Sequence, residues 1–237
     1  MRARLGGLRS PQAFGYKLGM RRMLGDYRLF WREFRGTFHT TGAVAPSAPP
    51  LAAALCRFAG AGPAPQRILE VGPGTGAVTA RLVRRMRPDD RLDLVELNDR
   101  FVRRLEARFA SEPSFCQVAD RVRILHRSVE DIDDPGGYDA IVSGLPLNNF
   151  AAADVERLLA QLSRLLRTGG TLSFFEYIAI RRARALISGR LERQRLEAIG
   201  RSLDRLLLPY EIRRDCVWPN LPPAWVHHVR LPAGAIA

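Results

Sequence analysis

A glycine-rich turn after an apolar segment is the first feature whose residue types and spacing indicate chemistry. Residues 70–76 read Glu-Val-Gly-Pro-Gly-Thr-Gly and continue the apolar run Arg67–Val71. Glycine lets the backbone turn sharply and approach a ligand where a Cβ atom would clash. Glu96 lies 20 residues after Gly76, at the end of a second apolar run, where an acid can accept hydrogen bonds from ribose hydroxyls. The pattern predicts a nucleoside site made of Glu70, Gly72, Gly74, Gly76 and Glu96.

Alternating strand-like and helix-like segments surround these residues. The predicted strands are Arg67–Val71, Arg91–Val95, Val122–Leu125, Tyr138–Ser143 and Thr171–Phe175, followed by two terminal strands between Asp215 and Arg230. The predicted helices are Gly76–Met86, Asn98–Phe109, Ala152–Leu166 and a long one between Arg181 and Leu208. This rhythm predicts an α/β fold with a doubly wound, mostly parallel sheet. In such sheets the ligand lies beyond the carboxyl ends of the strands.

The positive charge of the chain is concentrated in two segments. The 237 residues carry 37 Lys and Arg against 24 Asp and Glu, a formal charge of +13. Residues 1–40 have a net charge of +7 and residues 181–214 a net charge of +6, so the rest is neutral. Two basic segments beside a neutral body favour a polyanionic partner, either nucleic acid or an anionic membrane. Lys17 is the only lysine in the sequence, so the chain prefers arginine in general. That preference explains why the basic residues are arginines, but not why they cluster in two segments.

The first basic segment has the pattern of an amphipathic helix. Its apolar residues follow one another at steps of one, three or four from Met20 to Phe38, which is one face of a helix, and arginines occupy other positions. Large aromatic side chains opposite a cationic face are typical of helices that lie in a membrane interface. The candidate membrane residues are Tyr27, Phe30, Trp31, Phe34, Arg28 and Arg35. The alternative is an amphipathic helix packed on its own domain. The preferred division is a membrane-binding segment 1–40 and a domain 41–237.

Composition and length exclude several other classes. With 46% hydrophobic and 26% charged residues, the chain has globular composition and is long enough for one full domain. It has no apolar run near the roughly 18 residues of a transmembrane helix, and we expect no cleaved signal sequence. Three widely spaced cysteines favour a reduced, cytoplasmic chain. His227 and His228 are neighbours on a strand and point to opposite faces, so we expect no metal site, and no Ser-His-Asp arrangement is visible.

Glu-x-Gly-x-Gly-x-Gly followed by Glu96 resembles the nucleoside site of class I S-adenosylmethionine-dependent methyltransferases. The resemblance implies a Rossmann-like fold, with S-adenosylmethionine as cofactor and S-adenosylhomocysteine as product. It places Leu97 and Ser143 beside the cofactor. In many members an Asp after the third strand binds the adenine amino group. Here Ser128 aligns with it, so the Ser128 hydroxyl and the Val129 amide are the expected adenine contacts.

Three further motifs resemble the bacterial phospholipid N-methyltransferases, which convert phosphatidylethanolamine to phosphatidylcholine. They are residues 42–47 (Gly-Ala-Val-Ala-Pro-Ser), 143–147 (Ser-Gly-Leu-Pro-Leu) and 175–181 (Phe-Glu-Tyr-Ile-Ala-Ile-Arg). The resemblance covers about residues 20–230, and the family is described as peripheral, with an N-terminal amphipathic helix. It implies that the Leu145 carbonyl and the Ser143 side chain accept hydrogen bonds from the amine. The expected head-group residues are Tyr177, Arg181 and Arg182. Alternatively, Tyr177 belongs to the core and the two arginines are general surface charge.

These features favour a phospholipid N-methyltransferase on the inner face of the cell membrane. The expected partners are the phospholipid substrate and an anionic membrane surface, with no nucleic acid and no metal. We expect the long helix to cover the acceptor site and to offer a second membrane-facing surface. One alternative is an RNA adenine N6-methyltransferase, which the charge favours. However, the resembling motif in that family ends in an aromatic residue that stacks on the base, and Leu147 stands here. The other alternative is a non-catalytic membrane-binding protein.

Overall fold

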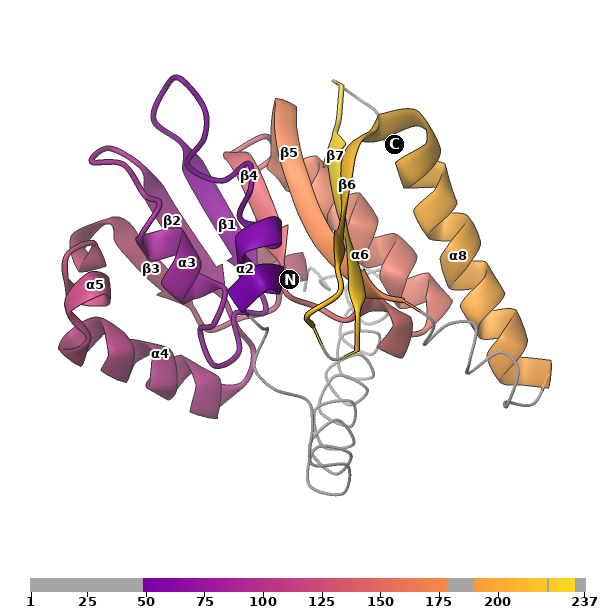
Figure 1. The fold of residues 1–237 in the computed structure, drawn as a ribbon, viewed down its shortest axis with the longest axis horizontal. Coiled ribbons are helices and arrows are strands. Elements are labelled where there is room, and N and C mark those ends of the chain that lie inside the picture. Colours follow the sequence, from indigo (N-terminus) through magenta and orange to yellow (C-terminus); the bar gives the residue numbers. More distant parts are fainter. Residues whose placement is uncertain (1–48, 179–189, 221, 233–237) are drawn as a thin grey trace, which may run out of the picture. The chain divides into compact units, whose positions relative to one another are not determined.

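Seven strands form one sheet in the computed structural model, which describes residues 49–178, 190–220 and 222–232. The strands follow the order β3-β2-β1-β4-β5-β7-β6 (Figure 1). Their bounds are β1 Arg67–Val71, β2 Arg91–Val95, β3 Val122–Leu125, β4 Tyr138–Ser143, β5 Leu166–Tyr177, β6 Glu211–Val217 and β7 Ala224–Arg230. The pairings are parallel from β3 to β5, whereas β7 is antiparallel to both β5 and β6. The prediction of a mostly parallel α/β sheet is therefore confirmed.

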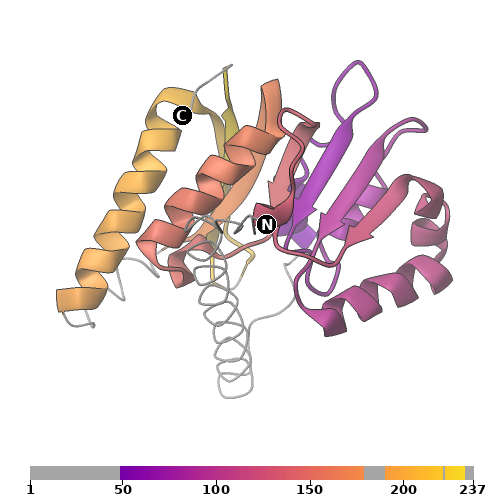
Figure 2. The same cartoon turned by 180° about the vertical axis from the view of Figure 1, so that it is seen from behind.

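Helices lie on both faces of the sheet, as Figures 1 and 2 show. The helices are α2 Pro49–Leu55, α3 Thr79–Val83, α4 Asp99–Ser111, α5 Pro113–Cys116, α6 Ala152–Leu165 and α8 Arg190–Tyr210. One core joins α2, α3, α4 and α5 to the inward side chains of β1, β2 and β4, such as Ile68, Leu92 and Ala140. On the other side, α6 contacts β5 and α8, and α8 contacts β6 and β7. The described part of the long predicted helix thus packs on the antiparallel end of the sheet.

The helix expected over Gly76–Met86 is shorter than predicted. Gly72, Gly74 and Gly76 have φ angles of 71°, 57° and 82°, which are incompatible with a right-handed helix. The chain therefore continues as a turn after β1, and α3 begins only at Thr79. β5 is longer than predicted, because it begins at Leu166 rather than Thr171.

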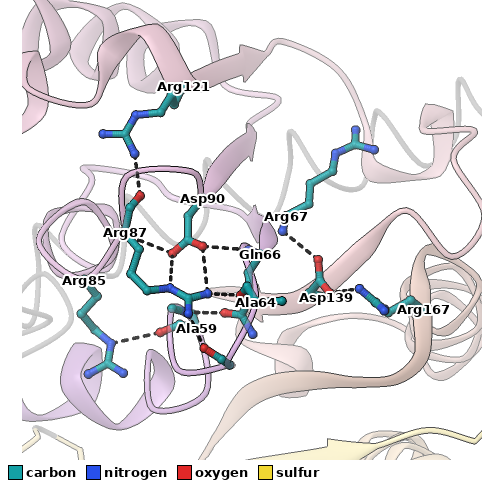
Figure 3. Close-up of polar contacts among 12 residues, drawn as sticks. Ala59, Ala64, Gln66, Arg67, Arg85, Arg87, Asp90, Arg121, Asp139 and Arg167 are labelled. Carbon is teal, nitrogen blue, oxygen red and sulfur yellow. Dashed lines mark hydrogen bonds and ion pairs between the residues drawn. The ribbon is translucent and has the colours of Figure 1, made fainter.

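A buried carboxylate ties together the sheet edge at which β1 and β2 begin. Asp90 is fully buried and accepts hydrogen bonds from the backbone N–H groups of Gln66 at 2.7 Å and Arg87 at 2.9 Å. Its third donor is the Arg87 guanidinium, and Arg121 donates to the Arg87 carbonyl at 2.7 Å (Figure 3). Charge-assisted bonds of this kind are among the stronger polar contacts in proteins. The amino ends of the strands are thus closed by structural contacts, whereas the turns that carry the predicted site lie at the carboxyl ends.

The antiparallel strands contain a Ser-His-Asp arrangement that the sequence pattern did not reveal. The Ser173 hydroxyl lies 2.8 Å from His228 Nδ1, and His228 Nε2 lies 3.3 Å from Asp215 Oδ2. Burial lowers the pKa of His228 to about 4 although Asp215 opposes this effect, so the ring is neutral at pH 7. Because Ser173 and His228 are buried in the sheet, a substrate has no access to them. The arrangement therefore cross-links β5, β7 and β6.

Two further observations concern metals and membranes. His227 stacks on Phe174 and His228 contacts the edge of Phe58, so the two histidines face opposite sides of the sheet, as predicted. The described part of the chain contains no cluster of three His, Cys, Asp or Glu residues suited to a metal. Within the same residues, no helix is long and apolar enough to span a bilayer.

Candidate active site

The glycine-rich turn begins where β1 ends and is held by backbone contacts to the neighbouring strands. Gly72 N–H donates to the Val95 carbonyl at 3.0 Å, and Gly76 N–H donates to the Pro73 carbonyl at 2.9 Å. A Cβ atom built on Gly74 would have no neighbour within 4 Å. The turn is therefore open at Gly74, where its backbone is accessible to a ligand.

The loop after β4 packs directly against this turn. Gly144 N–H donates to the Val71 carbonyl at 2.8 Å. A Cβ atom on Gly144 would lie 2.7 Å from the Gly72 carbonyl oxygen, and one on Gly72 would lie 2.5 Å from Leu145 Cδ2. Position 144 requires glycine because a Cβ atom would clash with backbone, and position 72 favours glycine because its φ angle is 71°. The two loops that the sequence assigned to the cofactor and the acceptor therefore meet at one point.

Arg108 of α4 holds the glycine-rich turn by its carbonyl groups, a role that the sequence did not reveal. Its Nη1 atom donates to the carbonyls of Thr75 at 3.0 Å and Gly76 at 2.7 Å. The guanidinium also lies over the Phe115 ring and pairs with Glu112 at 2.7 Å. Because Arg108 binds the carbonyl oxygens of the turn, the backbone N–H groups of the turn remain for other partners, such as the Glu96 carboxylate that accepts from Gly74 N–H. Arg108 is therefore a positioning residue for the predicted site.

Glu96 joins the glycine-rich turn to the loop after β2. Its Oε1 atom accepts from the N–H groups of Leu97 and Asn98 at 2.8 Å each, and its Oε2 atom accepts from Gly74 N–H at 3.1 Å. Burial raises the pKa of Glu96, and these three donors oppose that effect. A carboxylate can accept about four hydrogen bonds, so Oε2 retains capacity for one more. The side chain that was expected to bind ribose hydroxyls thus also organises the backbone around the site.

Glu70 is the most unusual group at this edge. It is fully buried, and among the residues that the structure describes neither of its carboxylate oxygens has a hydrogen-bond partner. The buried Thr79 hydroxyl lies near this carboxylate but makes no hydrogen bond of normal geometry within the described residues. Burial raises the pKa of Glu70 to about 8; the nearby hydroxyl and N–H group of Thr79 oppose the shift, and repulsion from Glu96 adds to it. An unpaired buried carboxylate is costly, and a cation beside it would reduce that cost.

These observations fit S-adenosylmethionine, the cofactor that the resemblance implies. Gly74 leaves open space above the turn, Glu96 retains acceptor capacity, and Glu70 is a buried carboxylate without a cationic or normally bonded partner in the described part of the chain. The ribose hydroxyls match the first two features, and the positive charge of the cofactor matches the third. The open backbone at Gly74 and the carboxylates of Glu96 and Glu70 therefore fit a nucleoside that carries a positive charge.

The predicted adenine contacts lie in a short 3₁₀ turn after β3. Ser128 caps this turn by accepting a hydrogen bond from Glu130 N–H at 3.3 Å, and Val129 is buried. Gln161 of α6 donates from Nε2 to the carbonyls of Val129 at 3.0 Å and Ile132 at 2.8 Å. Because one side chain holds both ends of the turn, Gln161 fixes the position of the predicted adenine contacts.

Replacing Gln161 with leucine is expected to raise KM for S-adenosylmethionine about tenfold, because two hydrogen bonds worth about 0.5–1.5 kcal/mol each are lost. The value of kcat should change little, since the reacting groups lie elsewhere. Steady-state kinetics with varied cofactor checks this result. Ser163→Ala is the matched control on the same helix, because within the described residues the Ser163 hydroxyl bonds to the Leu159 carbonyl of its own helix. An unchanged KM in Gln161→Leu would contradict the positioning role.

On the acceptor side, the structure separates two residues that the resemblance groups together. Ser143 is buried at the end of β4 and accepts a hydrogen bond from Leu145 N–H at 3.4 Å. Tyr177 ends the neighbouring strand β5 and packs edge-on against Phe175, with ring centroids 5.1 Å apart; burial raises the pKa of its hydroxyl. Val142 pairs with Ser173, so the side chains of Ser143 and Tyr177 point to opposite faces of the sheet. The contact of Tyr177 with the core is the alternative that the sequence left open.

Several predicted residues lie outside the described part of the chain. They are Tyr27, Phe30, Trp31, Phe34, Arg28, Arg35, Arg181 and Arg182, together with the motif at 42–47. Glu176, which the sequence analysis did not assign, lies at the end of β5 opposite Trp225. Strand alternation puts it on the same face as Ser143. It is a half-buried carboxylate at the predicted acceptor edge.

Comparisons with known proteins bear on the fold and on the class of enzyme. Residues 68–170 match the model of a family described as a methyltransferase domain. An ornithine lipid N-methyltransferase of Singulisphaera acidiphila is 30% identical over 153 residues, 62% of this chain and 76% of that protein. An uncharacterized methyltransferase of Mycobacterium tuberculosis is 29% identical over 166 residues, 70% of this chain and 74% of that protein. The O-methyltransferase TomG of Streptomyces achromogenes, solved with S-adenosylmethionine, is 18% identical, with a TM-score of 0.57 over 87% of this chain and 88% of that structure.

Proposed function

The chain is a class I S-adenosylmethionine-dependent methyltransferase, and we propose that its acceptor is the amine of phosphatidylethanolamine and of its methylated intermediates, leading towards phosphatidylcholine. The observation that carries the lipid acceptor is the 30% identity to an ornithine lipid N-methyltransferase, over 76% of that protein. The motifs at residues 143–147 and 175–181 support phosphatidylethanolamine in particular, through their resemblance to phospholipid N-methyltransferases.

The cofactor supplies an activated methyl group on a positively charged sulfur. Glu70 and Glu96 would bind the cofactor through their carboxylates, and Gly72, Gly74 and Gly76 would bind it through their backbone. Leu97, Ser128 and Val129 would complete the nucleoside site. Since the methyl group is already activated, the protein's main tasks are to position the acceptor nitrogen and to exclude water.

The loop after β4 would orient the acceptor. A lipid amine titrates near ~10, like lysine, and has no lone pair while it is protonated. The Leu145 carbonyl and the Ser143 hydroxyl would accept hydrogen bonds from the amine and so direct its nitrogen. Glu176 contributes a carboxylate on the same face of the sheet, which favours a cationic substrate at this edge. Arg181 and Arg182 are the proposed head-group residues, because a guanidinium can hold two phosphate oxygens. The Tyr177 ring packs on Phe175 and faces the other side of the sheet from Ser143, so Tyr177 is no longer proposed for this role.

Ornithine lipid is the second candidate acceptor, favoured by the same relative. Both lipids present a primary amine at a membrane surface, but only phosphatidylethanolamine carries a phosphate. An RNA acceptor is less consistent with the site, because Leu147 is buried and offers no exposed ring on which a base could stack. The cofactor features likewise disfavour a non-catalytic role.

A lipid acceptor requires the enzyme to reach a membrane. We propose that residues 1–40 form the membrane-binding segment and that the enzyme acts peripherally on the inner face of the cell membrane. Their net charge of +7 and their aromatic residues support an interfacial helix on anionic lipid.

Expression of the chain in a bacterium that makes phosphatidylethanolamine but no methylated derivative tests the proposal. Mass spectrometry of the extracted lipids should show mono-, di- or trimethylated phosphatidylethanolamine with the wild type and none with Glu96→Ala. A normal lipid profile despite soluble, cofactor-binding protein would contradict phosphatidylethanolamine as the acceptor. Supplying ornithine lipid to the purified protein then tests the second candidate.

A further inference from the structure

Trp218 is a large apolar side chain that the fold leaves in solvent. It follows β6 directly and is 68% exposed. Of the described large apolar residues, Leu208 at 87% and Ile212 at 43% share this property. An exposed tryptophan is less easily explained as chance than an exposed leucine, because its ring is the largest apolar surface of any side chain. The position of Trp218 in the fold therefore indicates which kind of surface it contacts.

The strand register places Trp218 at the edge of the sheet that carries the active site. Val217 of β6 pairs with Ala224 of β7, and Ala224 pairs with Tyr177 at the end of β5. The turn that begins at Trp218 therefore lies beside the carboxyl end of β5. β6 is three strands from β4 in the sheet, which corresponds to about 14 Å at a strand spacing of about 4.8 Å. Leu208 and Ile212 lie where α8 ends and β6 begins, at the opposite edge.

The connection between β6 and β7 is fixed by hydrogen bonds. Asn220 is buried and donates from Nδ2 to the Pro222 carbonyl at 2.7 Å. The Pro223 carbonyl accepts from Ile178 N–H at 2.7 Å, which ties the turn to the residue after β5. Proline at 219, 222 and 223 further restricts the backbone. A fixed turn holds the indole outward at little cost in conformational entropy on binding.

We propose that Trp218 is an interfacial anchor that inserts into the bilayer supplying the acceptor lipid. Indole rings are enriched at membrane interfaces, where the ring packs among lipid and its N–H group stays near polar head groups. The formal charge of +13 complements an anionic membrane. The separation of about 14 Å between β4 and β6 would keep the active-site edge close to the lipid head groups. This inference rests on the proposed function, because it assumes a lipid acceptor.

The direct test is the fluorescence of Trp218 in a variant that lacks the other two tryptophans, Trp31→Phe/Trp225→Phe. The probe is a vesicle of phosphatidylethanolamine and phosphatidylglycerol, with and without brominated acyl chains. We expect a blue shift of the emission on vesicle binding and quenching by the brominated lipid. Unchanged emission from protein that co-sediments with the vesicles would overturn the inference.

A second measurement uses exposed residues at opposite edges of the sheet. Trp218→Ser is expected to weaken vesicle binding about tenfold and to lower kcat/KM on vesicles, with cofactor affinity unchanged. Leu208→Ser, the matched control, should bind vesicles and methylate lipid like wild type.

The outcomes separate this inference from the proposed function. If wild type methylates lipid and both variants match it, Trp218 is not a membrane anchor, but the proposed function stands. If wild type methylates no lipid, the proposed function fails. If Trp218→Ser changes the oligomeric state of the protein without a change in vesicle binding, Trp218 lies in a protein–protein contact and the inference is overturned.

Discussion

Replacing Glu96 with alanine is expected to lower the affinity for S-adenosylmethionine by about 100-fold or more. The carboxylate accepts hydrogen bonds from the N–H groups of Gly74, Leu97 and Asn98, and each bond to a charged group is worth about 1.5–3 kcal/mol. Removal leaves the three donors without this partner, releases the glycine-rich turn and deletes the expected acceptor for a ribose hydroxyl. Loss of about 2.7 kcal/mol of cofactor binding corresponds to 100-fold. Isothermal titration calorimetry with S-adenosylmethionine measures the effect.

A matched control separates this effect from general loss of charge. Glu106→Ala removes a carboxylate from the exposed side of α4 and should leave cofactor affinity unchanged. Association of Glu96→Ala with anionic vesicles should also persist, because the predicted membrane segment is remote in sequence. A change in cofactor affinity of less than about threefold in folded Glu96→Ala would place the nucleoside site elsewhere. Equal loss of cofactor and vesicle binding would show that the variant does not fold.

The second large effect is a pH dependence of cofactor binding that originates at Glu70. Burial raises the pKa of this carboxyl to about 8, so at pH 7 the free enzyme holds it mainly as the neutral acid. A cationic ligand favours the ionised form, and binding therefore releases a proton. We expect affinity for S-adenosylmethionine to rise by up to about tenfold per pH unit below about 8 and then to level off.

The same shift has a defined sign for the stability of the free enzyme. The carboxyl has its ordinary pKa of 4.5 in the unfolded chain and a pKa of about 8 in the folded protein. Between these values the folded state binds more protons than the unfolded state, so the free energy of unfolding decreases as pH rises through this window. The stabilising contribution is complete below about 4.5 and lost above about 8. Thermal unfolding at a series of pH values, with and without cofactor, measures it.

Glu70→Gln provides the test for both effects. The neutral amide cannot titrate, so the variant should bind the cofactor more weakly at high pH and lose the pH dependence of binding. Its free form should be more stable than wild type above about pH 8, because no buried charge forms. Proton release is measured by calorimetry in two buffers of different ionisation enthalpy. A wild type that releases no proton, with affinity independent of pH, would contradict the assignment of Glu70.

The sequence predicted the sheet well because its strands are short apolar runs between turn residues. The first four strands begin and end where the apolar runs do. The helix after β1 was predicted to begin at Gly76, because helical spacing does not show that Gly76 has a positive φ angle. Glu70 and Glu96 were identified from their spacing to the glycines, whereas the absence of partners for Glu70 among the described residues depends on packing from several elements.

The supporting residues could not be predicted, because their partners are distant in sequence. Gln161 binds carbonyls 29 and 32 residues away, and Arg108 reaches back 32 and 33 residues to the glycine-rich turn. The contact of Ser173 with His228 spans 55 residues. Only the strand order brings these groups together. For the same reason, motif resemblance grouped Ser143 with Tyr177, although strand alternation turns their side chains to opposite faces.

The most direct test of the central claim is methyl transfer by the purified protein. It is incubated with methyl-labelled S-adenosylmethionine and phosphatidylethanolamine vesicles, with bulk RNA as a parallel acceptor, and the lipids are separated by thin-layer chromatography. We expect label in mono-, di- or trimethylated phosphatidylethanolamine and none in RNA, with the distribution showing how far methylation proceeds. Label in RNA alone, or no labelled lipid from protein that binds the cofactor and the vesicles, would contradict the account.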